Sequence, residues 1–210
     1  MEFTLKILKT GMMAILMVAA IHTKAQDSSS LSTAFSTSYT YENKGEHSKA
    51  IESLKKVYDE SSYEINLRLG WLNYQLGLFS ESVAYYNKAI SLMPLSIEAR
   101  LGFVLPASSQ GNWEQVITRY NEILKLDPNH YTVNYRMGMI YYGRKDYQSA
   151  FRYFERIANF YPFDYDALLM LGWTNFQLGK LREAKVLFQK ALLNRPDDTS
   201  AKEGLSLIKS

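Results

Sequence analysis

Few residue types in this chain could carry out chemistry. It has no Cys, which excludes disulfides, thiol catalysis and thiolate metal sites. Outside the first 25 residues the only histidines are His47 and His130, and neither has a second His or a carboxylate at metal-ligand spacing. The Gly172…Gly179-Lys180 stretch has too long a spacing for a phosphate loop, and no Ser or Thr follows the lysine. We therefore predict no catalytic site, no metal site and no cofactor.

The composition is that of a globular chain whose body is nearly neutral. Of its 210 residues, 47% are hydrophobic and 21% are charged, which excludes a wholly disordered chain. The formal net charge is +3, but three Lys and one Glu lie in the first 25 residues, which leaves 21 basic and 20 acidic residues beyond them. Nucleic-acid-binding domains usually have a clear excess of basic residues, and this part of the chain has none. We therefore predict no nucleic-acid partner.

The N-terminal segment has the three parts of a secretory signal peptide. Two lysines precede an apolar run from Gly11 to Ile21. The sequence Thr23-Lys24-Ala25 then places a small residue at both recognition positions of a signal peptidase. The alternative is an uncleaved membrane anchor, which needs about 20 apolar residues, whereas the uncharged stretch has 14. We predict a signal peptide over 1–25 cleaved near Ala25, a polar tether over 26–30, a periplasmic or secreted protein, and no integral membrane span in the mature chain.

The rest of the chain repeats with a period of 34 residues. Stacking on this period aligns the windows 63–96, 97–130, 131–164 and 165–198. The aligned columns hold prolines (Pro94, Pro128, Pro162, Pro196), glycines (Gly77, Gly111, Gly179) and aromatic residues (Tyr86, Tyr120, Phe154, Phe188). This pattern resembles the tetratricopeptide repeat (TPR), a helix–turn–helix unit with Leu-Gly in its first helix and Ala and an aromatic residue in its second. The resemblance implies an all-α, right-handed superhelical solenoid of tandem repeats.

The two ends of the array depart from the pattern. A weaker copy over 31–62 lacks the Leu-Gly pair and the proline and is two residues short, so whether it is stably folded is left open. Residues 199–210 begin another first helix, with Ala201, Leu205 and Ile208 three or four residues apart. We predict that this segment is a capping helix, and that 31–210 form one domain of about five repeats.

The window 97–130 carries Gly102 and Pro106 in its first helix. Pro106 cannot donate a hydrogen bond to the carbonyl of Gly102, and its ring crowds that carbonyl. We therefore predict a kinked or broken helix at this point. Two interpretations stay open, a functional hinge and a tolerated degenerate repeat.

The inner face of a TPR array is where members of the family bind their partners, and the resemblance places 25 positions of this chain on it. Thirteen of these are apolar or aromatic: Phe35, Tyr39, Leu67, Trp71, Tyr74, Leu101, Leu105, Tyr135, Met139, Tyr142, Leu169, Trp173 and Phe176. The charged ones are Glu42, Glu64, Glu98 and Asp166. The Lys and Asn clamp by which some members hold a C-terminal carboxylate is missing, so the resemblance does not extend to binding of chaperone tails.

These residues predict a partner-binding groove, because exposed aromatic surface marks interaction sites and Trp and Tyr dominate binding hot spots. We expect a non-catalytic adaptor that binds an apolar peptide or an amphipathic helix of another protein. One alternative is that the same residues pack as core. Others are a self-associating scaffold, in which case the chain is a homo-oligomer, and a glycan-binding subunit of a cell-envelope complex.

Overall fold

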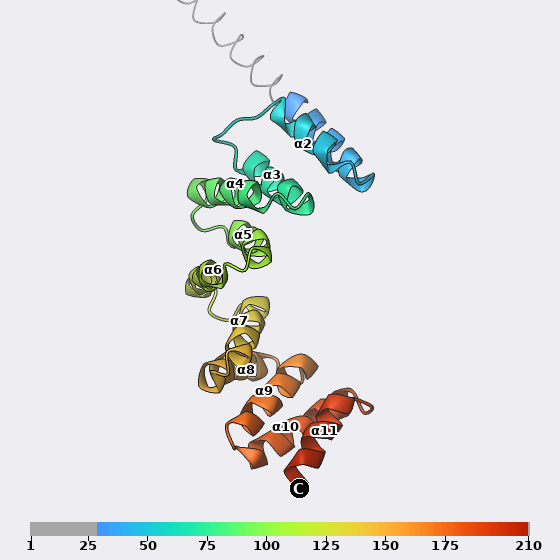
Figure 1. The fold of residues 1–210 in the computed structure, drawn as a ribbon, viewed down its shortest axis with the longest axis vertical. Coiled ribbons are helices and arrows are strands. Elements are labelled where there is room, and N and C mark those ends of the chain that lie inside the picture. Colours follow the sequence, from blue (N-terminus) through green and yellow to red (C-terminus); the bar gives the residue numbers. More distant parts are fainter. Residues whose placement is uncertain (1–28, 210) are drawn as a thin grey trace, which may run out of the picture. The chain divides into compact units, whose positions relative to one another are not determined.

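The structure, a computed structural model, describes residues 29–209, and all of its regular secondary structure is helical. Helical residues 29–43 precede the labelled helices (Figure 1). These are α2 (His47–Lys55), α3 (Tyr63–Gln75), α4 (Phe79–Leu92), α5 (Ile97–Ser109), α6 (Trp113–Leu126), α7 (Tyr131–Gly143), α8 (Tyr147–Phe160), α9 (Tyr165–Gln177), α10 (Leu181–Asn194) and α11 (Thr199–Lys209). No strand occurs between residues 29 and 209. The predicted all-α fold is confirmed, while the predicted signal peptide lies outside the described residues.

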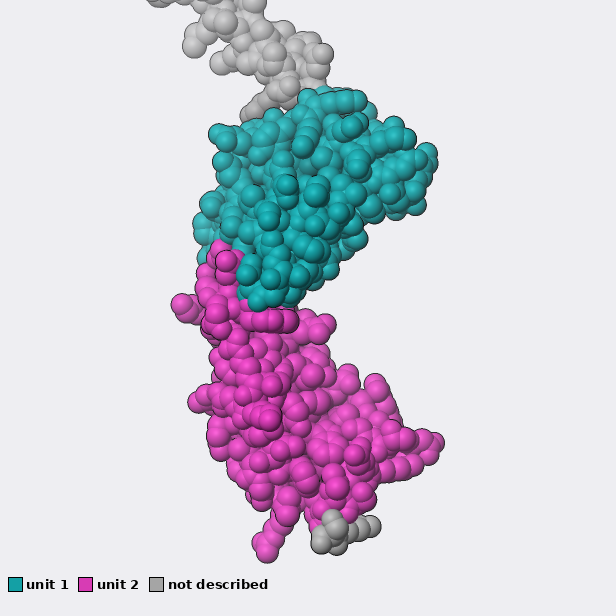
Figure 2. Space-filling model, viewed as in Figure 1, with its two compact units in different colours: residues 1–112 teal, residues 113–210 magenta. Residues whose placement is uncertain are grey.

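The helices form two compact units (Figure 2). The first ends at Asn112 and the second begins at Trp113. In the first unit, α3 packs against α2 and α4, and α5 packs against α3 and α4. In the second unit, α8 packs against α7 and α9, and α10 packs against α9 and α11. Each of the windows 63–96, 131–164 and 165–198 therefore contains one pair of helices joined by a short turn.

Tyr86 of α4 joins two successive repeats of the first unit. Its side chain is 3% exposed and lies against two glycines, Gly70 of α3 and Gly102 of α5. A Cβ atom added at Gly70 would lie 3.0 Å from the ring, and one added at Gly102 would lie 2.2 Å from it. Beside them, the hydroxyl of Ser82 donates to the carbonyl of Gly70 at 2.7 Å. The small residues Gly70 and Ser82 thus let α3 and α4 approach each other closely at this point.

The second unit repeats this arrangement at its C-terminal end. Phe188 of α10 is fully buried between Gly172 of α9 and Gly204 of α11. Added Cβ atoms there would lie 2.8 and 2.4 Å from the ring. Phe154 of α8 lies in the same way against Gly138 of α7. Helix α11 thus covers the last repeat, and its Ala201 is buried in the same cluster as Phe188, as expected for a capping helix.

Helix α5 is continuous through Pro106, so of the two predicted outcomes the broken helix is wrong, while the kink stays a prediction. The helix runs 13 residues, the same length as α3, α7 and α9. Proline removes only its own N–H donor, and the hydrogen-bond ladder resumes beyond it, with the Gln110 amide donating to the Pro106 carbonyl at 3.0 Å. Gly102 is explained by the Tyr86 ring that it accommodates rather than by a break in the helix.

A tyrosine at the start of one repeat bonds to the residue that caps the next. The Tyr131 hydroxyl donates to Asp164 Oδ1 at 3.0 Å, and the Tyr165 hydroxyl donates to Asp198 Oδ2 at 2.5 Å. Asp164 accepts from the Ala167 amide at the N-terminus of α9, which satisfies one of the free N–H groups there. These bonds connect neighbouring repeats at their polar edge. The window 97–130 starts with Ile97 and has no such tyrosine.

Candidate functional site

The thirteen apolar residues predicted for the inner face are divided between the two units. Seven lie in the first unit, from Phe35 to Leu105, and six lie in the second, from Tyr135 to Phe176. None of the thirteen is buried. Tyr39 is 50% exposed, Met139 38% and Leu105 36%, and the other ten are half-buried. Each unit therefore presents its own set of partly open apolar side chains, hereafter the aromatic face of that unit.

In the first unit a partly buried ion pair holds two rings of the aromatic face. Arg68, which is 8% exposed, donates to Glu42 at 2.5 Å, and its guanidinium lies 3.8 Å from the centre of the Tyr39 ring. The other oxygen of Glu42 accepts from the indole N–H of Trp71 at 2.5 Å. Burial raises the pKa of Glu42, but the bonds from Arg68 and Trp71 outweigh it and keep that pKa below its usual value. Glu42 therefore stays ionised at neutral pH and fixes both rings.

From Trp71 a series of tilted ring contacts leads to two further aromatic residues. Trp71 lies 5.9 Å from Tyr74, and Tyr74 lies 6.0 Å from Phe79, measured between ring centres. Such offset and tilted arrangements are the favoured geometry of aromatic pairs. Since the indole N–H of Trp71 is already bonded to Glu42, this surface offers a partner mainly ring faces and edges, together with the hydroxyls of its tyrosines.

In the second unit the face lies on α7 and α9, and two tyrosines of α7 each pair with a further tyrosine ring. Tyr135 stacks with Tyr131 at 6.4 Å with an interplanar angle of 1°, and Tyr142 meets Tyr147 edge to face at 5.3 Å. Burial raises the pKa of Tyr142, against the opposing effect of its bond to Gln177, so the hydroxyl stays protonated.

Trp173 completes the face of the second unit. It contacts Phe176 at 5.7 Å and the buried Phe188 at 5.0 Å, and its indole N–H donates to Ser200 at 2.9 Å. As at Trp71, the polar atom of the indole is satisfied within the protein. Leu169, Trp173 and Phe176 pack onto the core that α9, α10 and α11 share, which gives this part of the face a rigid base.

The residues considered for chemistry have structural roles. His130 caps α7 through its Nδ1 atom, which accepts from the Val133 amide at 3.4 Å, and His47 is the first residue of α2. Gly179 has φ of 73° in a turn, and the Lys180 ammonium lies 4.4 Å above the Phe151 ring. Within residues 29–209, no three His, Cys, Asp or Glu side chains gather into a group that could hold a metal ion.

Sequence reasoning missed a set of exposed apolar residues at the turns between repeats. Phe160, Tyr161 and Phe163 in the second unit are 59%, 50% and 56% exposed, and Met93 and Leu95 in the first are 52% and 77% exposed. They flank the prolines at 162 and 94, so the signal was present in the proline column. These turns are more open than most of the aromatic face and provide a second surface on which a protein could dock.

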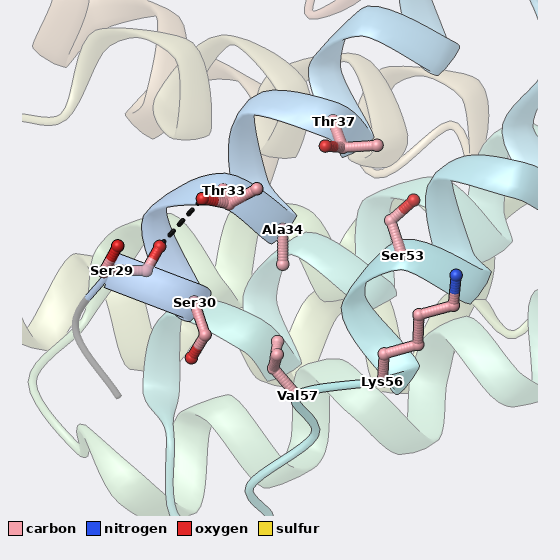
Figure 3. Close-up of a pocket in the computed structure, with 8 residues that line it drawn as sticks. All are labelled: Ser29, Ser30, Thr33, Ala34, Thr37, Ser53, Lys56 and Val57. Carbon is pink, nitrogen blue, oxygen red and sulfur yellow. Dashed lines mark hydrogen bonds between the residues drawn. The ribbon is translucent and has the colours of Figure 1, made fainter. Parts of the chain in front are cut away.

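The first pair of helices holds a polar hollow of about 460 Å³. Hydroxyls line most of it, from Ser29, Ser30, Thr33, Thr37 and Ser53, with Lys56 at one side (Figure 3). Two of these hydroxyls are engaged by carbonyls of their own helix: Thr33 bonds to Ser29 and Ser53 bonds to Lys49, each at 2.9 Å. The hollow is therefore chemically unlike the aromatic face.

No helix between residues 29 and 209 has the length and apolar composition needed to cross a bilayer.

Tandem pairs of helices are joined by tight turns, most of which carry a glycine with positive φ, and aromatic side chains of one helix pack against glycines of the next. These features define a helical-repeat protein. Family models described as tetratricopeptide repeat match residues 35–61, 63–94, 106–165 and 141–208. Together these matches cover most of the chain, and the chain belongs to the tetratricopeptide-repeat family. The family resemblance read from the 34-residue period is confirmed.

Solved structures show the same fold. The crystal structure of a tetratricopeptide repeat protein from Parabacteroides merdae matches with a TM-score of 0.72 at 23% identity, covering 86% of this chain and 72% of that one. The crystal structure of MamA protein matches with a TM-score of 0.67 at 22% identity, covering 78% of this chain and 90% of that one. The expected fold, a solenoid of tetratricopeptide repeats, is confirmed.

A longer curated protein is also similar. The chain is 26% identical over 179 residues to BBSome complex member BBS4 of Bos taurus, covering 76% of this chain and 34% of that protein. The chain thus spans about a third of the length of this relative. Tetratricopeptide-repeat proteins are generally non-catalytic, and the family defines this chain as a protein-interaction or scaffold module.

Proposed function

We propose that this protein is an adaptor whose aromatic faces bind an apolar peptide or an amphipathic helix of another protein. One observation carries the proposal: none of the thirteen residues is buried, although all are aromatic or large apolar side chains. Apolar surface left open on a folded protein is a marker of an interaction site. The relative BBS4 is named as a member of a protein complex, which supports the same class of function.

The chemistry of the faces defines the class of partner. The indole N–H groups of Trp71 and Trp173 are bonded internally, so most of the affinity comes from burying rings. Three of the acidic side chains on these faces, Glu64, Glu98 and Asp166, are exposed. A partner segment with apolar anchors and a basic flank fits both features, because exposed carboxylates give register and specificity more than affinity.

Open positions of the face allow a test that leaves the core untouched. We expect Tyr39→Glu and Met139→Glu to abolish recovery of the partner when the tagged chain is isolated from its native cell, since each places a charge where an apolar side chain would be buried. Lys185→Glu on α10 is the matched control, because Lys185 is exposed and lies outside the face. Recovery of the same partner by all three variants at the level of the unchanged protein would refute the proposal.

Self-association is the competing use of the same faces. If a second copy covers them, the purified chain should dimerise, and Met139→Glu should return it to the monomer in sedimentation equilibrium. An adaptor with a separate partner stays monomeric before and after the substitution.

We also propose that the protein is exported and acts in the periplasm or outside the cell. The support is the lysine-led apolar run at 11–21 and the small residues before Gln26. N-terminal sequencing of protein isolated from the native cell should begin at Gln26. An intact Met1 on protein in the soluble cytoplasmic fraction would refute export.

A further inference from the structure

The second unit contains a basic hollow that shares no residue with the aromatic face. It has a volume of about 540 Å³ and lies among α6, α7 and α8. Seven side chains line it: Asn121, Leu124 and Lys125 from α6, Asn134 from α7, and Arg152, Tyr153 and Arg156 from α8. Three of the seven are cations and none is a carboxylate. We call this site the basic hollow.

The three cations of the hollow differ from two arginines of the same unit that have acidic partners. Arg119 pairs with Glu122 and Arg144 pairs with Glu114, each at 3.0 Å. Across residues 29–209, Lys125, Arg152 and Arg156 form no ion pair. Uncompensated charges of one sign around a concave surface concentrate the field within it and attract a counter-ion.

Neutral hydrogen bonds hold the two arginines in place. Arg152 donates through Nη2 to the Ser149 hydroxyl at 2.9 Å, and Arg156 donates through Nη1 to the Pro128 carbonyl at 3.1 Å. The same carbonyl accepts from Asn134 Nδ2 at 3.0 Å, which ties α7 and α8 to the turn between α6 and α7. Each guanidinium keeps further N–H groups after these bonds. Since residues four apart on a helix share a face, both arginines are presented together.

Tyr153 stands between the two arginines in the sequence and supports this geometry. Its ring stacks on Tyr141 at 5.6 Å with an interplanar angle of 9°, which fixes one wall of the hollow. Burial raises the pKa of Tyr153, and Arg152 and Arg156 both act to lower it. Both arginines therefore exert their positive charge on the Tyr153 hydroxyl in this wall of the hollow.

We propose that the basic hollow binds the phosphate group of an organic phosphate. Guanidinium groups match the geometry of phosphate oxygens and bond to them in pairs, and Lys125 adds a third positive charge opposite a doubly charged anion. The hollow has a volume typical of small-molecule sites, so it has room for the organic part beside the phosphate. A soluble phosphate ester and a phospholipid headgroup share this chemistry.

The test uses the full chain with both kinds of probe. Glycerol 1-phosphate serves as the soluble ester in isothermal titration calorimetry, and phosphatidylcholine vesicles with and without an equal share of phosphatidylglycerol serve in co-sedimentation. The variants are Arg152→Gln and Arg156→Gln. Arg182→Gln is the matched control, because it removes the same charge from an exposed arginine on α10 outside the hollow. The apolar segment 11–21 is present in every variant and cancels in the comparison.

Loss of one charge-assisted pair should weaken binding by about tenfold to a hundredfold in Arg152→Gln and Arg156→Gln, while Arg182→Gln binds as the unchanged protein does. This result with glycerol 1-phosphate supports a soluble ligand, and the same result only with phosphatidylglycerol vesicles supports a lipid headgroup. Binding of neither probe would overturn the proposal, and so would an equal loss in Arg182→Gln. Unchanged circular dichroism and midpoints of thermal unfolding exclude misfolding of the variants.

Discussion

Substitution of Gly102 by Ala is the sharpest test of how neighbouring repeats pack. Alanine is the better helix former, and in the middle of a helix it is favoured over glycine by about 1 kcal/mol. Gly102 lies in α5, so propensity alone predicts a more stable protein. The packing predicts the opposite, because the new Cβ would lie 2.2 Å from Cε1 of Tyr86.

The size of the effect follows from the freedom of the Tyr86 ring. To reach ordinary contact the ring must move by more than an ångström. Gly70 lies so close on the other side that a Cβ added there would be 3.0 Å from the ring, and Tyr86 is only 3% exposed. Overpacking of a core that cannot relax costs about 1–3 kcal/mol. At the upper end of that range, and after the gain in helix propensity, we expect Gly102→Ala to lower the free energy of unfolding by about 2 kcal/mol.

Urea denaturation followed by circular dichroism measures this change as a lower midpoint at constant slope. Gly143→Ala is the matched control, since nothing lies within 4 Å of its added Cβ at the end of α7. That variant should be as stable as the unchanged protein or slightly more so. In the background of Tyr86→Leu the penalty of Gly102→Ala should shrink, because the two residues couple directly. A Gly102→Ala protein as stable as the Gly143→Ala control would refute the packing argument.

Three further predictions concern turns, ion pairs and caps. Lys145 has φ of 61° where other repeats have glycine. Lys145→Gly should raise the free energy of unfolding by about 0.5 kcal/mol, because it relieves more backbone strain than it adds in entropy of the unfolded chain. A lower urea midpoint would contradict this. Glu42→Ala should cost about 3 kcal/mol because it leaves the buried Arg68 unpaired, and a midpoint within error of the unchanged protein would count against the ion pair. Burial raises the pKa of Tyr165 to about 12, and its bond to Asp198 helps to lower the pKa of that carboxyl against the effect of burial. This stabilisation is complete above the unfolded-state pKa of Asp198 and is lost as the pH falls through the lower folded-state value. Tyr165→Phe should therefore be less stable by about 1.5 kcal/mol at neutral pH and should lose less stability on acidification; parallel acid titrations of the two proteins would contradict it.

The period of the sequence was enough to predict the helix pairs, because the proline, glycine and aromatic columns each have one structural cause. Pro94 and Pro162 lie just beyond the ends of α4 and α8, and Phe188 meets Gly172 as the columns predict. The role of Gly102 could not be read within its own window. Its contact is with Tyr86 in the previous repeat, and in the same column only Gly204 in α11 is again a glycine.

The polar features of the site were harder to predict, because they depend on contacts between distant residues. Arg68 and Glu42 are 26 residues apart and belong to different repeats, so no local pattern pairs them. Phe160 and Phe163 were visible in the sequence, but their exposure depends on how α8 and α9 meet. The cations of the basic hollow come from α6 and α8, and a net charge of only +3 for the whole chain conceals such a local cluster.

Site-specific photo-crosslinking in the native cell tests the central claim most directly. A photoreactive residue at Met139 reports on the aromatic face of the second unit, one at Phe163 reports on the exposed turn, and one at Lys185 is the control; all three positions are exposed. We predict that one discrete protein is crosslinked from Met139 and not from Lys185. Crosslinking of that protein from Phe163 but not from Met139 would contradict the claim and assign binding to the turn.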